Sequence, residues 1–207
     1  MKRRIEKSVY VFDSLGQPAE IYDSEKKASE KSKSVFDWVS SIMASFVVIF
    51  LIFAFGFRVV QVSGESMTNT LQHRDWLLVS NFEKHVQFGD IVVATPPTYK
   101  GGPVIKRVIG VAGDEIYIDF NKGEVYVNGK VLDEPYTKTP TTLSYDVEFP
   151  VRVPENCVFV MGDNRNGSLD SRSTQIGIIN EKYILGRVLI RVFPFEKIEY
   201  INLRQEA

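Results

Sequence analysis

Two residues of the chain have the types needed for nucleophilic catalysis. Ser66 lies in the polar stretch VSGESMTNTL, residues 62–71, and Lys106 lies in the apolar stretch GGPVIKRVIG, residues 101–110. Burial among valines favours the neutral form of a lysine, because it disfavours the charge. A neutral amine can act as a general base and take the proton of a serine hydroxyl. Residue types alone leave this Ser–Lys pairing as one hypothesis among many.

The strand expected at residues 103–109 would place Lys106 and Arg107 on opposite faces, because successive side chains of a strand alternate. Arginine stays charged near neutral pH, so Lys106 is the candidate base and Arg107 is not. We therefore expect Lys106 to be largely buried and Arg107 not to be. In the alternative interpretation, both side-chain stems lie along apolar surface while their charged ends reach water.

The elements that must position these residues are predicted to be β-strands. Short runs rich in Val, Ile, Tyr and Phe follow residue 58, separated by turn residues. Asn128-Gly129 between two such runs is typical of a type I′ hairpin. The segment 133–150 carries prolines and threonines and is expected to be a long hairpin or a loop excursion, and a short helix is expected only within residues 172–182. Strands are predicted at 76–82, 90–95, 103–111, 115–120, 124–132, 157–163 and 183–193.

An uncharged apolar run at residues 39–57 predicts a transmembrane helix. At about 1.5 Å per residue it spans about 28 Å, close to the ~30 Å hydrocarbon core. Four lysines precede the run within residues 26–33 and two arginines, Arg58 and Arg74, follow it, which favours a cytoplasmic N-terminus. A buried core helix and a cleaved signal peptide are the alternatives. The run is unusually uniform for a soluble helix, and the 38 residues before it are long for a signal peptide.

Composition excludes several classes of protein. The 207 residues have a formal net charge of -1, so no basic field indicates nucleic-acid binding. One cysteine, Cys157, excludes an intramolecular disulfide and a cysteine-rich zinc site. With two histidines, His73 and His85, a histidine-based metal cluster is not expected. No metal or organic cofactor is implied.

Three segments together resemble type I signal peptidase, the membrane-anchored Ser–Lys protease family that removes signal peptides from exported proteins. They are VSGESMTNTL after an N-terminal anchor, then VIKRVIGVAGDEI, then GDNRNGSLDSR at residues 162–172. The resemblance covers roughly residues 60–193. The small size and single anchor resemble the Gram-positive members of the family.

The resemblance implies a role for each matched residue. Ser66 would be the nucleophile, with its backbone N–H in the oxyanion hole. Lys106 would be the neutral base and would later protonate the leaving amine. Ser168 would hydrogen-bond the Lys106 amine, and Asp170 and Arg172 would form a supporting ion pair.

The same resemblance implies further features of the site. Asp163 and Arg165 would hold the 162–172 loop. Small apolar substrate residues would fit pockets, for which the candidate lining residues are Val62, Met67, Leu71 and Ile105. Two positions depart from the family pattern. Gly64 stands where some members have a serine that donates to the oxyanion, and Asn69 stands where proline is usual. Asparagine is a good turn residue, so we expect the turn to survive.

The resemblance also implies an organisation and partners. A cytoplasmic segment (1–37), a transmembrane anchor (38–58) and an extracytoplasmic, mainly antiparallel β catalytic domain (59–207) are expected. The expected partners are preproteins that carry signal peptides, the lipid bilayer and a nearby secretion translocon, without nucleic acid. Ser66 follows the apolar run by only nine positions, a reach of at most about 30 Å, which would keep it near the outer surface of the cytoplasmic membrane.

Three other functions compete with this interpretation. The first is a membrane-tethered β domain that binds a partner and catalyses nothing. The second is a self-cleaving Ser–Lys protein of the repressor type, which would need a DNA-binding domain. The third is a serine hydrolase with His73 or His85 beside Ser66. We expect both histidines to be surface polar residues.

Overall fold

The computed structural model describes residues 11–12, 16, 18–19, 24–82 and 85–201. Contacts divide the chain into two units, residues 1–50 and 51–207. In the first unit, β1 (Val11–Phe12) pairs antiparallel with β2 (Pro18–Ala19). Most of the predicted cytoplasmic segment before residue 24 lies outside the described residues.

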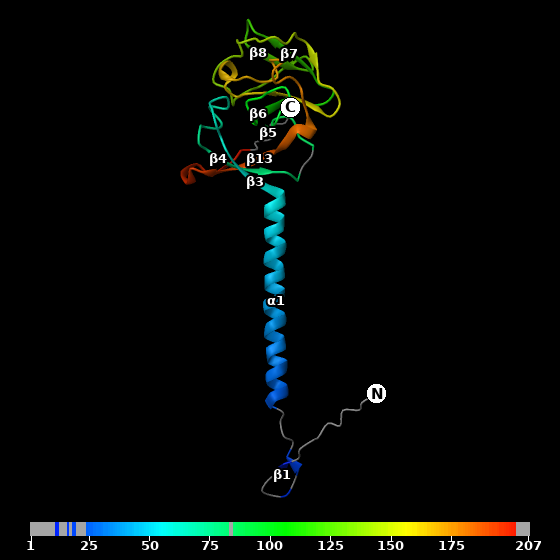
Figure 1. The fold of residues 1–207 in the computed structure, drawn as a ribbon. Helices are drawn as coiled ribbons and strands as arrows, with labels where there is room; N and C mark the ends of the chain where they lie inside the picture. Colours follow the sequence, from blue (N-terminus) through cyan, green and yellow to red (C-terminus); the bar gives the residue numbers. More distant parts are fainter. Residues whose placement is uncertain (1–10, 13–15, 17, 20–23, 83–84, 202–207) are drawn as a thin grey trace. The chain divides into compact units, whose positions relative to one another are not determined.

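The helix α1 (Ser24–Gly56) contains the predicted anchor (Figure 1). It begins before the apolar run, since residues 24–34 form its first turns. The stretch Val35–Gly56 is long and apolar enough to cross a membrane. The large apolar side chains that the structure describes in this stretch are exposed, as expected for a helix that faces lipid. The helix ends at Gly56, and residues 57–58, which we included in the anchor, belong to the next strand.

The second unit is built on a sheet of eight strands in the order β12-β11-β6-β5-β13-β4-β3, with β14 paired to β13. Every pairing in it is antiparallel, which confirms the predicted mainly antiparallel β class. The strands are β3 (Phe57–Gln61), β4 (Trp76–Ser80), β5 (Ile91–Ala94), β6 (Val104–Gly110), β11 (Cys157–Met161), β12 (Ile179–Asn180), β13 (Ile184–Phe193) and β14 (Glu199–Tyr200).

A second sheet has the order β10-β7-β8-β9 and lies at the opposite end of this unit from β3 (Figure 1). The turn at Asn128-Gly129 has positive φ at both positions, 51° and 78°, as a type I′ hairpin requires, so this prediction is confirmed. Its strands are β7 (Glu115–Asp119), β8 (Glu124–Val127), β9 (Lys130–Val131) and β10 (Val151–Arg152).

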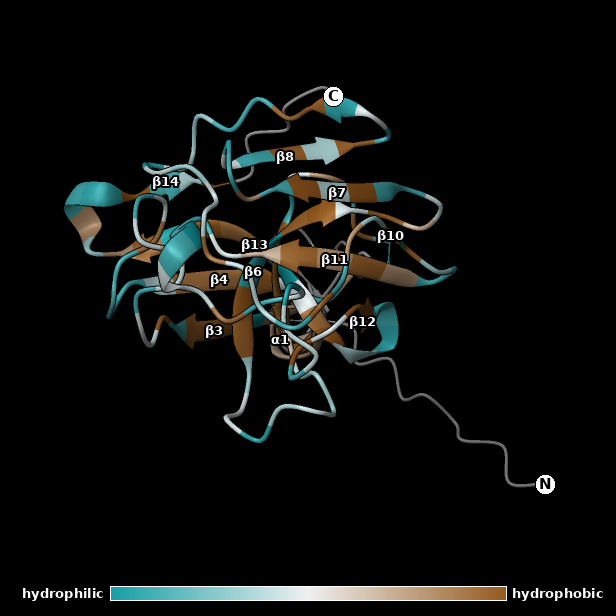
Figure 2. Ribbon diagram, turned by 90° about the horizontal axis from the view of Figure 1, so that it is seen from above, coloured by the Kyte–Doolittle hydropathy of each residue, from teal (hydrophilic) through white to brown (hydrophobic). Residues whose placement is uncertain are grey.

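Three clusters of buried aliphatic and aromatic side chains form the core of this unit. Apolar residues predominate in the central strands β6, β11 and β13 (Figure 2). In β6, Val104 and Val108 pack in one cluster, whereas Ile105 packs in a second cluster and Ile109 in a third. The predicted alternation of faces along this strand is therefore confirmed.

The segment 133–150 forms neither helix nor strand and is a loop excursion, as expected. Regular structure between residues 172 and 182 is limited to β12 and to the start of the 3-10 helix η2 (Glu181–Tyr183). Two more 3-10 turns are η1 (Arg165–Gly167) and η3 (Phe195–Lys197). The sequence did not predict the strands β3, β10, β12 and β14, of which three have only two residues.

Candidate active site

Strand β6 places Lys106 beside Ser66. Lys106 Nζ lies 2.8 Å from Ser66 Oγ and 3.1 Å from the carbonyl oxygen of Ile105. The Lys106 side chain is buried, with a residue exposure of 4%, and Val92 of β5 is its partner in the ladder. Ser66 is half-buried, so its hydroxyl can still be approached from solvent. The predicted proximity and burial are both confirmed.

Burial lowers the pKa of Lys106 from 10.5 to about 8. The negative charges of Asp170 and Asp163 oppose this change, and the positive charge of Arg172 adds to it. Desolvation is the largest of these effects, because the amine loses the water that would stabilise its charge. A substantial fraction of the amine is therefore neutral in mildly alkaline solution and able to accept a proton from Ser66.

The prediction that Arg107 would not be buried is wrong. Its exposure is 4%, equal to that of Lys106. Asp163 accepts two hydrogen bonds from its guanidinium, at 2.8 and 2.7 Å, and the Gly89 carbonyl accepts a third at 3.0 Å. The guanidinium also lies 4.1 Å from the centre of the Tyr136 ring. A buried arginine is tolerated where its charge and its donors are matched in this way.

Hydrogen bonds from a neighbouring loop fix the turn that carries Ser66. Asn164 donates its backbone N–H to the Ser66 carbonyl at 3.0 Å and its amide to the Glu65 carbonyl at 3.1 Å. Gly64 has φ of +98°, a conformation that favours glycine, and its N–H donates to His73 Nδ1 at 3.2 Å. The Gly64 N–H is therefore already engaged by a side chain on the far side of the turn.

The loop at residues 162–172 packs against the same turn. Arg172 and Asp170 form a fully buried ion pair, with Nε 2.8 Å from Oδ1, as predicted. Asp170 Oδ2 also accepts the Gly162 N–H at 3.0 Å. A Cβ at Gly162 would lie 2.2 Å from Ser168 Oγ and 2.5 Å from the Ser66 carbonyl oxygen, so only glycine fits between them.

Ser168 does not make the predicted hydrogen bond to Lys106 in this structure. Its Oγ is buried and has no hydrogen-bond partner among the described residues. A buried hydroxyl without a partner costs about 1–3 kcal/mol, so such a group calls for a functional explanation.

Asp163 and Arg165 hold the loop, but through partners that the sequence did not indicate. Asp163 pairs with Arg107 on β6, and Arg165 pairs with Glu134 of the 133–150 excursion at 2.5 Å. Nothing in the local pattern around Glu134 distinguishes it from a surface acid. Its role appears only when the excursion folds onto the loop.

A cavity of about 560 Å³ opens beside Ser66 and Lys106. Of the four residues predicted to line a substrate pocket, Val62, Met67 and Ile105 line it. Leu71 does not line it, and its side chain is fully buried in a core cluster. Further lining residues that sequence reasoning missed include Tyr99, Pro103 and Leu169.

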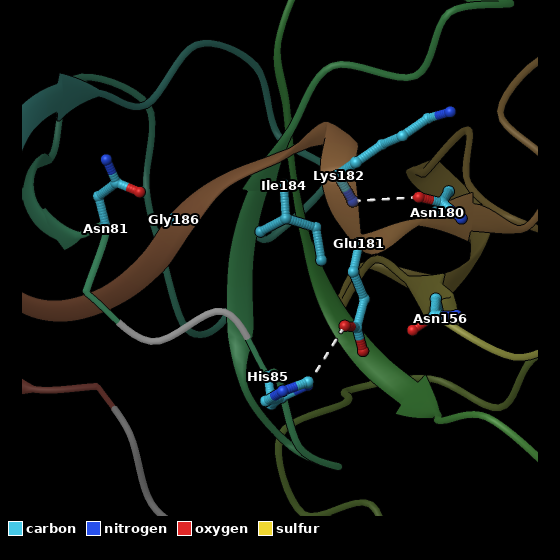
Figure 3. Close-up of a pocket in the computed structure, with 8 residues that line it drawn as sticks. All are labelled: Asn81, His85, Asn156, Asn180, Glu181, Lys182, Ile184 and Gly186. Carbon is cyan, nitrogen blue, oxygen red and sulfur yellow. Dashed lines mark hydrogen bonds and ion pairs between the residues drawn. The ribbon is translucent and has the colours of Figure 1, made fainter.

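Neither histidine lines this cavity. His85 is 90% exposed and lies 3.6 Å from Glu181 in a separate polar hollow (Figure 3). The side chains around that hollow are mostly amides and charged groups, from Asn81, His85, Asn156, Asn180, Glu181 and Lys182. The expectation that both histidines are surface polar residues is confirmed by their exposure.

The chain is similar to known proteins over most of its length. Residues 35–193 match the family model described as signal peptidase, peptidase S26. Signal peptidase I P of Bacillus subtilis subsp. natto is 34% identical over 190 residues, which cover 87% of this chain and 99% of that protein. Signal peptidase I S of Bacillus subtilis strain 168 is 35% identical over 185 residues, covering 83% of this chain and 96% of that protein. A solved signal peptidase I from Enterococcus faecalis V583 aligns at 29% identity and a TM-score of 0.41, covering 50% of this chain and 96% of that chain.

Proposed function

The chain belongs to the signal peptidase family, peptidase S26, as a protease of the signal peptidase I type, and we propose that it cleaves signal peptides from exported preproteins with Ser66 as nucleophile and Lys106 as general base. The observation that carries this mechanism is the 2.8 Å separation of Ser66 Oγ from a buried Lys106 amine. Geometry and a lowered pKa together are what a general base requires.

Acylation would begin when Ser66 Oγ attacks the scissile carbonyl carbon and its proton passes to neutral Lys106. The resulting oxyanion would accept a hydrogen bond from the Ser66 backbone N–H, which has no acceptor among the described residues. The Lys106 ammonium would then give its proton to the leaving amine as the peptide bond breaks. The mature protein leaves with this new N-terminus, and the signal peptide remains as an ester on Ser66.

Ser66 and Lys106 would also carry out deacylation, in which Lys106 returns a proton to Ser66 Oγ. Lys106, neutral again, would take a proton from a water molecule that attacks the ester carbonyl. The proton would return to Ser66 Oγ as the ester bond breaks and the signal peptide departs as a carboxylic acid. One base therefore serves both half-reactions, as in other covalent hydrolytic mechanisms.

Ser168, Asp170 and Arg172 would support the base. The Asp170–Arg172 pair fixes the loop on which Ser168 is carried and contributes charges of both signs near Lys106. The unpartnered Ser168 hydroxyl is available to hydrogen-bond the amine when it becomes an ammonium during the reaction. We assign Ser168 an orienting role on this ground.

The cavity beside Ser66 would receive the signal-peptide residues that precede the cleavage point. Val62, Met67 and Ile105 give it an apolar wall, and its volume of about 560 Å³ suits a short extended segment with small side chains. We propose that these three residues limit side-chain size in the substrate.

We place the catalytic domain on the outer side of the cytoplasmic membrane, with the N-terminus in the cytoplasm. The lysines before the apolar stretch support this orientation. Because β3 starts directly after α1, Ser66 stays within about 30 Å of the helix end. A signal peptide that leaves the secretion translocon presents its cleavage site at the same level.

The first test uses the full-length chain in detergent with a secretory preprotein. We expect one cleavage after a small-x-small sequence, read by sequencing the N-terminus of the product. Ser66→Ala and Lys106→Ala should abolish it, whereas Lys122→Ala, which removes an exposed lysine of the turn between β7 and β8, should not. A folded wild-type chain that binds preproteins without cutting them would favour the non-catalytic binding module instead.

A further inference from the structure

The backbone of the nucleophile turn is strained at Asn69. Its φ is +114°, well beyond the left-handed region near +57° that asparagine visits most readily. Proline fixes φ near -65°, so it could not adopt the conformation found here. Strained backbone of this kind persists where surrounding contacts enforce it and is concentrated at functional sites.

The Asn69 side chain connects the turn to the 133–150 excursion. Asn69 Nδ2 donates to the carbonyl oxygen of Tyr136 at 3.2 Å. The ring of Tyr136 packs on the guanidinium of Arg107, 4.1 Å from its centre. Arg107 is the immediate neighbour of Lys106 on β6, so this contact ties the turn to the strand that carries the base.

Hydrogen bonds also fix the next residue, Thr70. Its hydroxyl donates to Asp163 Oδ2 at 2.5 Å, and Asp163 is the carboxylate that pairs with Arg107. Arg191 of β13 donates to the Thr70 carbonyl at 2.6 Å. The end of the turn is therefore fixed by groups from the 162–172 loop, β13 and the excursion.

The constraint at residue 69 reaches Ser66 through a short, hydrogen-bonded segment. Thr70 and Leu71 both donate their N–H groups to the Met67 carbonyl, at 3.1 and 2.8 Å. A change of φ at Asn69 would rotate this closed turn as a body and move Ser66 Oγ relative to Lys106 Nζ. A displacement of 1 Å at reacting atoms can cost on the order of 100-fold in rate.

We propose that Asn69 is a positioning residue, whose positive φ and amide bond to the Tyr136 carbonyl set the orientation of Ser66 against Lys106. This inference rests on the proposed Ser66–Lys106 mechanism and deepens it.

Three substitutions separate the two contributions of Asn69. Asn69→Gly keeps the positive φ accessible but loses the amide, and kcat should fall about threefold. Asn69→Ala also disfavours the backbone conformation, and kcat should fall about tenfold. Asn69→Pro forbids the conformation, and kcat should fall by on the order of 100-fold. KM should stay near the wild-type value, because Val62, Met67 and Ile105 are unchanged.

Asn128 offers a matched control far from the cavity. It also has positive φ, 51°, and its amide also donates a hydrogen bond, to Asp114 at 2.8 Å. Asn128→Ala and Asn128→Pro should lower Tm without changing kcat. For the same loss of Tm, an Asn69 variant should lower kcat far more than an Asn128 variant does.

The outcomes distinguish this inference from the mechanism on which it depends. If wild type cleaves, Ser66→Ala does not, and Asn69→Pro keeps wild-type kcat, the positioning role is wrong and the dyad stands. The positioning role is also wrong if Asn69 variants, including the milder Asn69→Gly, lose no more kcat than Asn128 variants with the same loss of Tm. Cleavage that persists in Ser66→Ala contradicts the mechanism itself.

Discussion

Ser66 Oγ and Lys106 Nζ lie 2.8 Å apart across a sequence separation of 40 residues. The turn supplies the hydroxyl and the central strand β6 supplies the amine. The neighbouring Arg107 points to the other face, where it holds Asp163 and, through it, Thr70 at the far end of the same turn. Two adjacent residues of one strand thus act on the two ends of the nucleophile turn.

Cleavage should depend on pH through Lys106. Its pKa is lowered by burial to about 8, and only the neutral amine accepts the Ser66 proton, so the rate should rise with pH and level off above about 8. Lys106→Arg should be inactive throughout, because arginine remains charged. Single-turnover cleavage measured between pH 6 and 10 checks this. A rate that is already at its plateau at pH 6 would rule out Lys106 as the titrating base.

Stability should depend on pH in the direction set by the same residue. The folded pKa of Lys106, about 8, lies below the ordinary value of 10.5, so between these pH values the unfolded chain binds one more proton and stability rises with pH. At pH 7 the buried ammonium costs up to about 3 kcal/mol. Lys106→Met should therefore be more stable than wild type at pH 7 and lose this advantage above pH 10.5.

Denaturant unfolding at pH 7 and pH 10.5 measures the difference directly. Lys100→Met, at an exposed position, should change the free energy of unfolding little at either pH. If Lys106→Met is equally destabilised at both pH values, the contacts of the amine stabilise the folded chain more than its burial destabilises it.

Removal of Asp170 should destabilise the chain strongly. Asp170→Ala leaves the fully buried Arg172 without its carboxylate, and breaking a buried pair in this way costs about 3–5 kcal/mol. Lys122, an exposed lysine 3.8 Å from Asp119, offers a control, since an ion pair of an exposed side chain contributes about 0–1 kcal/mol. Free energies of unfolding for Asp170→Ala and Lys122→Ala should differ by more than 2 kcal/mol on these grounds. Equal values would mean that Arg172 finds other acceptors.

Ser168→Ala should lower activity without lowering stability. The hydroxyl is buried without a partner, so its removal should leave Tm unchanged or raise it. If Ser168 orients the Lys106 amine during the reaction, kcat should fall at least tenfold at the same time. Tm and kcat measured on one preparation test both statements. A variant with wild-type kcat would leave Ser168 a packing residue only.

Much of the fold follows from local patterns. Short runs rich in Val, Ile, Tyr and Phe located β4, β5, β6, β7 and β13, and Asn128-Gly129 located a hairpin, because β propensity and positive φ are properties of short segments. Strand β3 was not predicted. Its residues follow an apolar helix without a turn signal, and only pairing with β4 over five positions makes them a strand.

The sequence by itself determined the apolar anchor and the β class, since both depend on residue types and short spacings. Ser66 and Lys106 became the candidate pair through the resemblance of three sequence segments to type I signal peptidase. Tertiary structure decided that Arg107 is buried, that Leu71 belongs to the core, and that Asn69 adopts a φ closed to proline. Each of these depends on a partner far along the chain: Asp163 for Arg107, the core cluster for Leu71 and Tyr136 for Asn69. Burial and charge pairing are set by such distant neighbours, which no local pattern specifies.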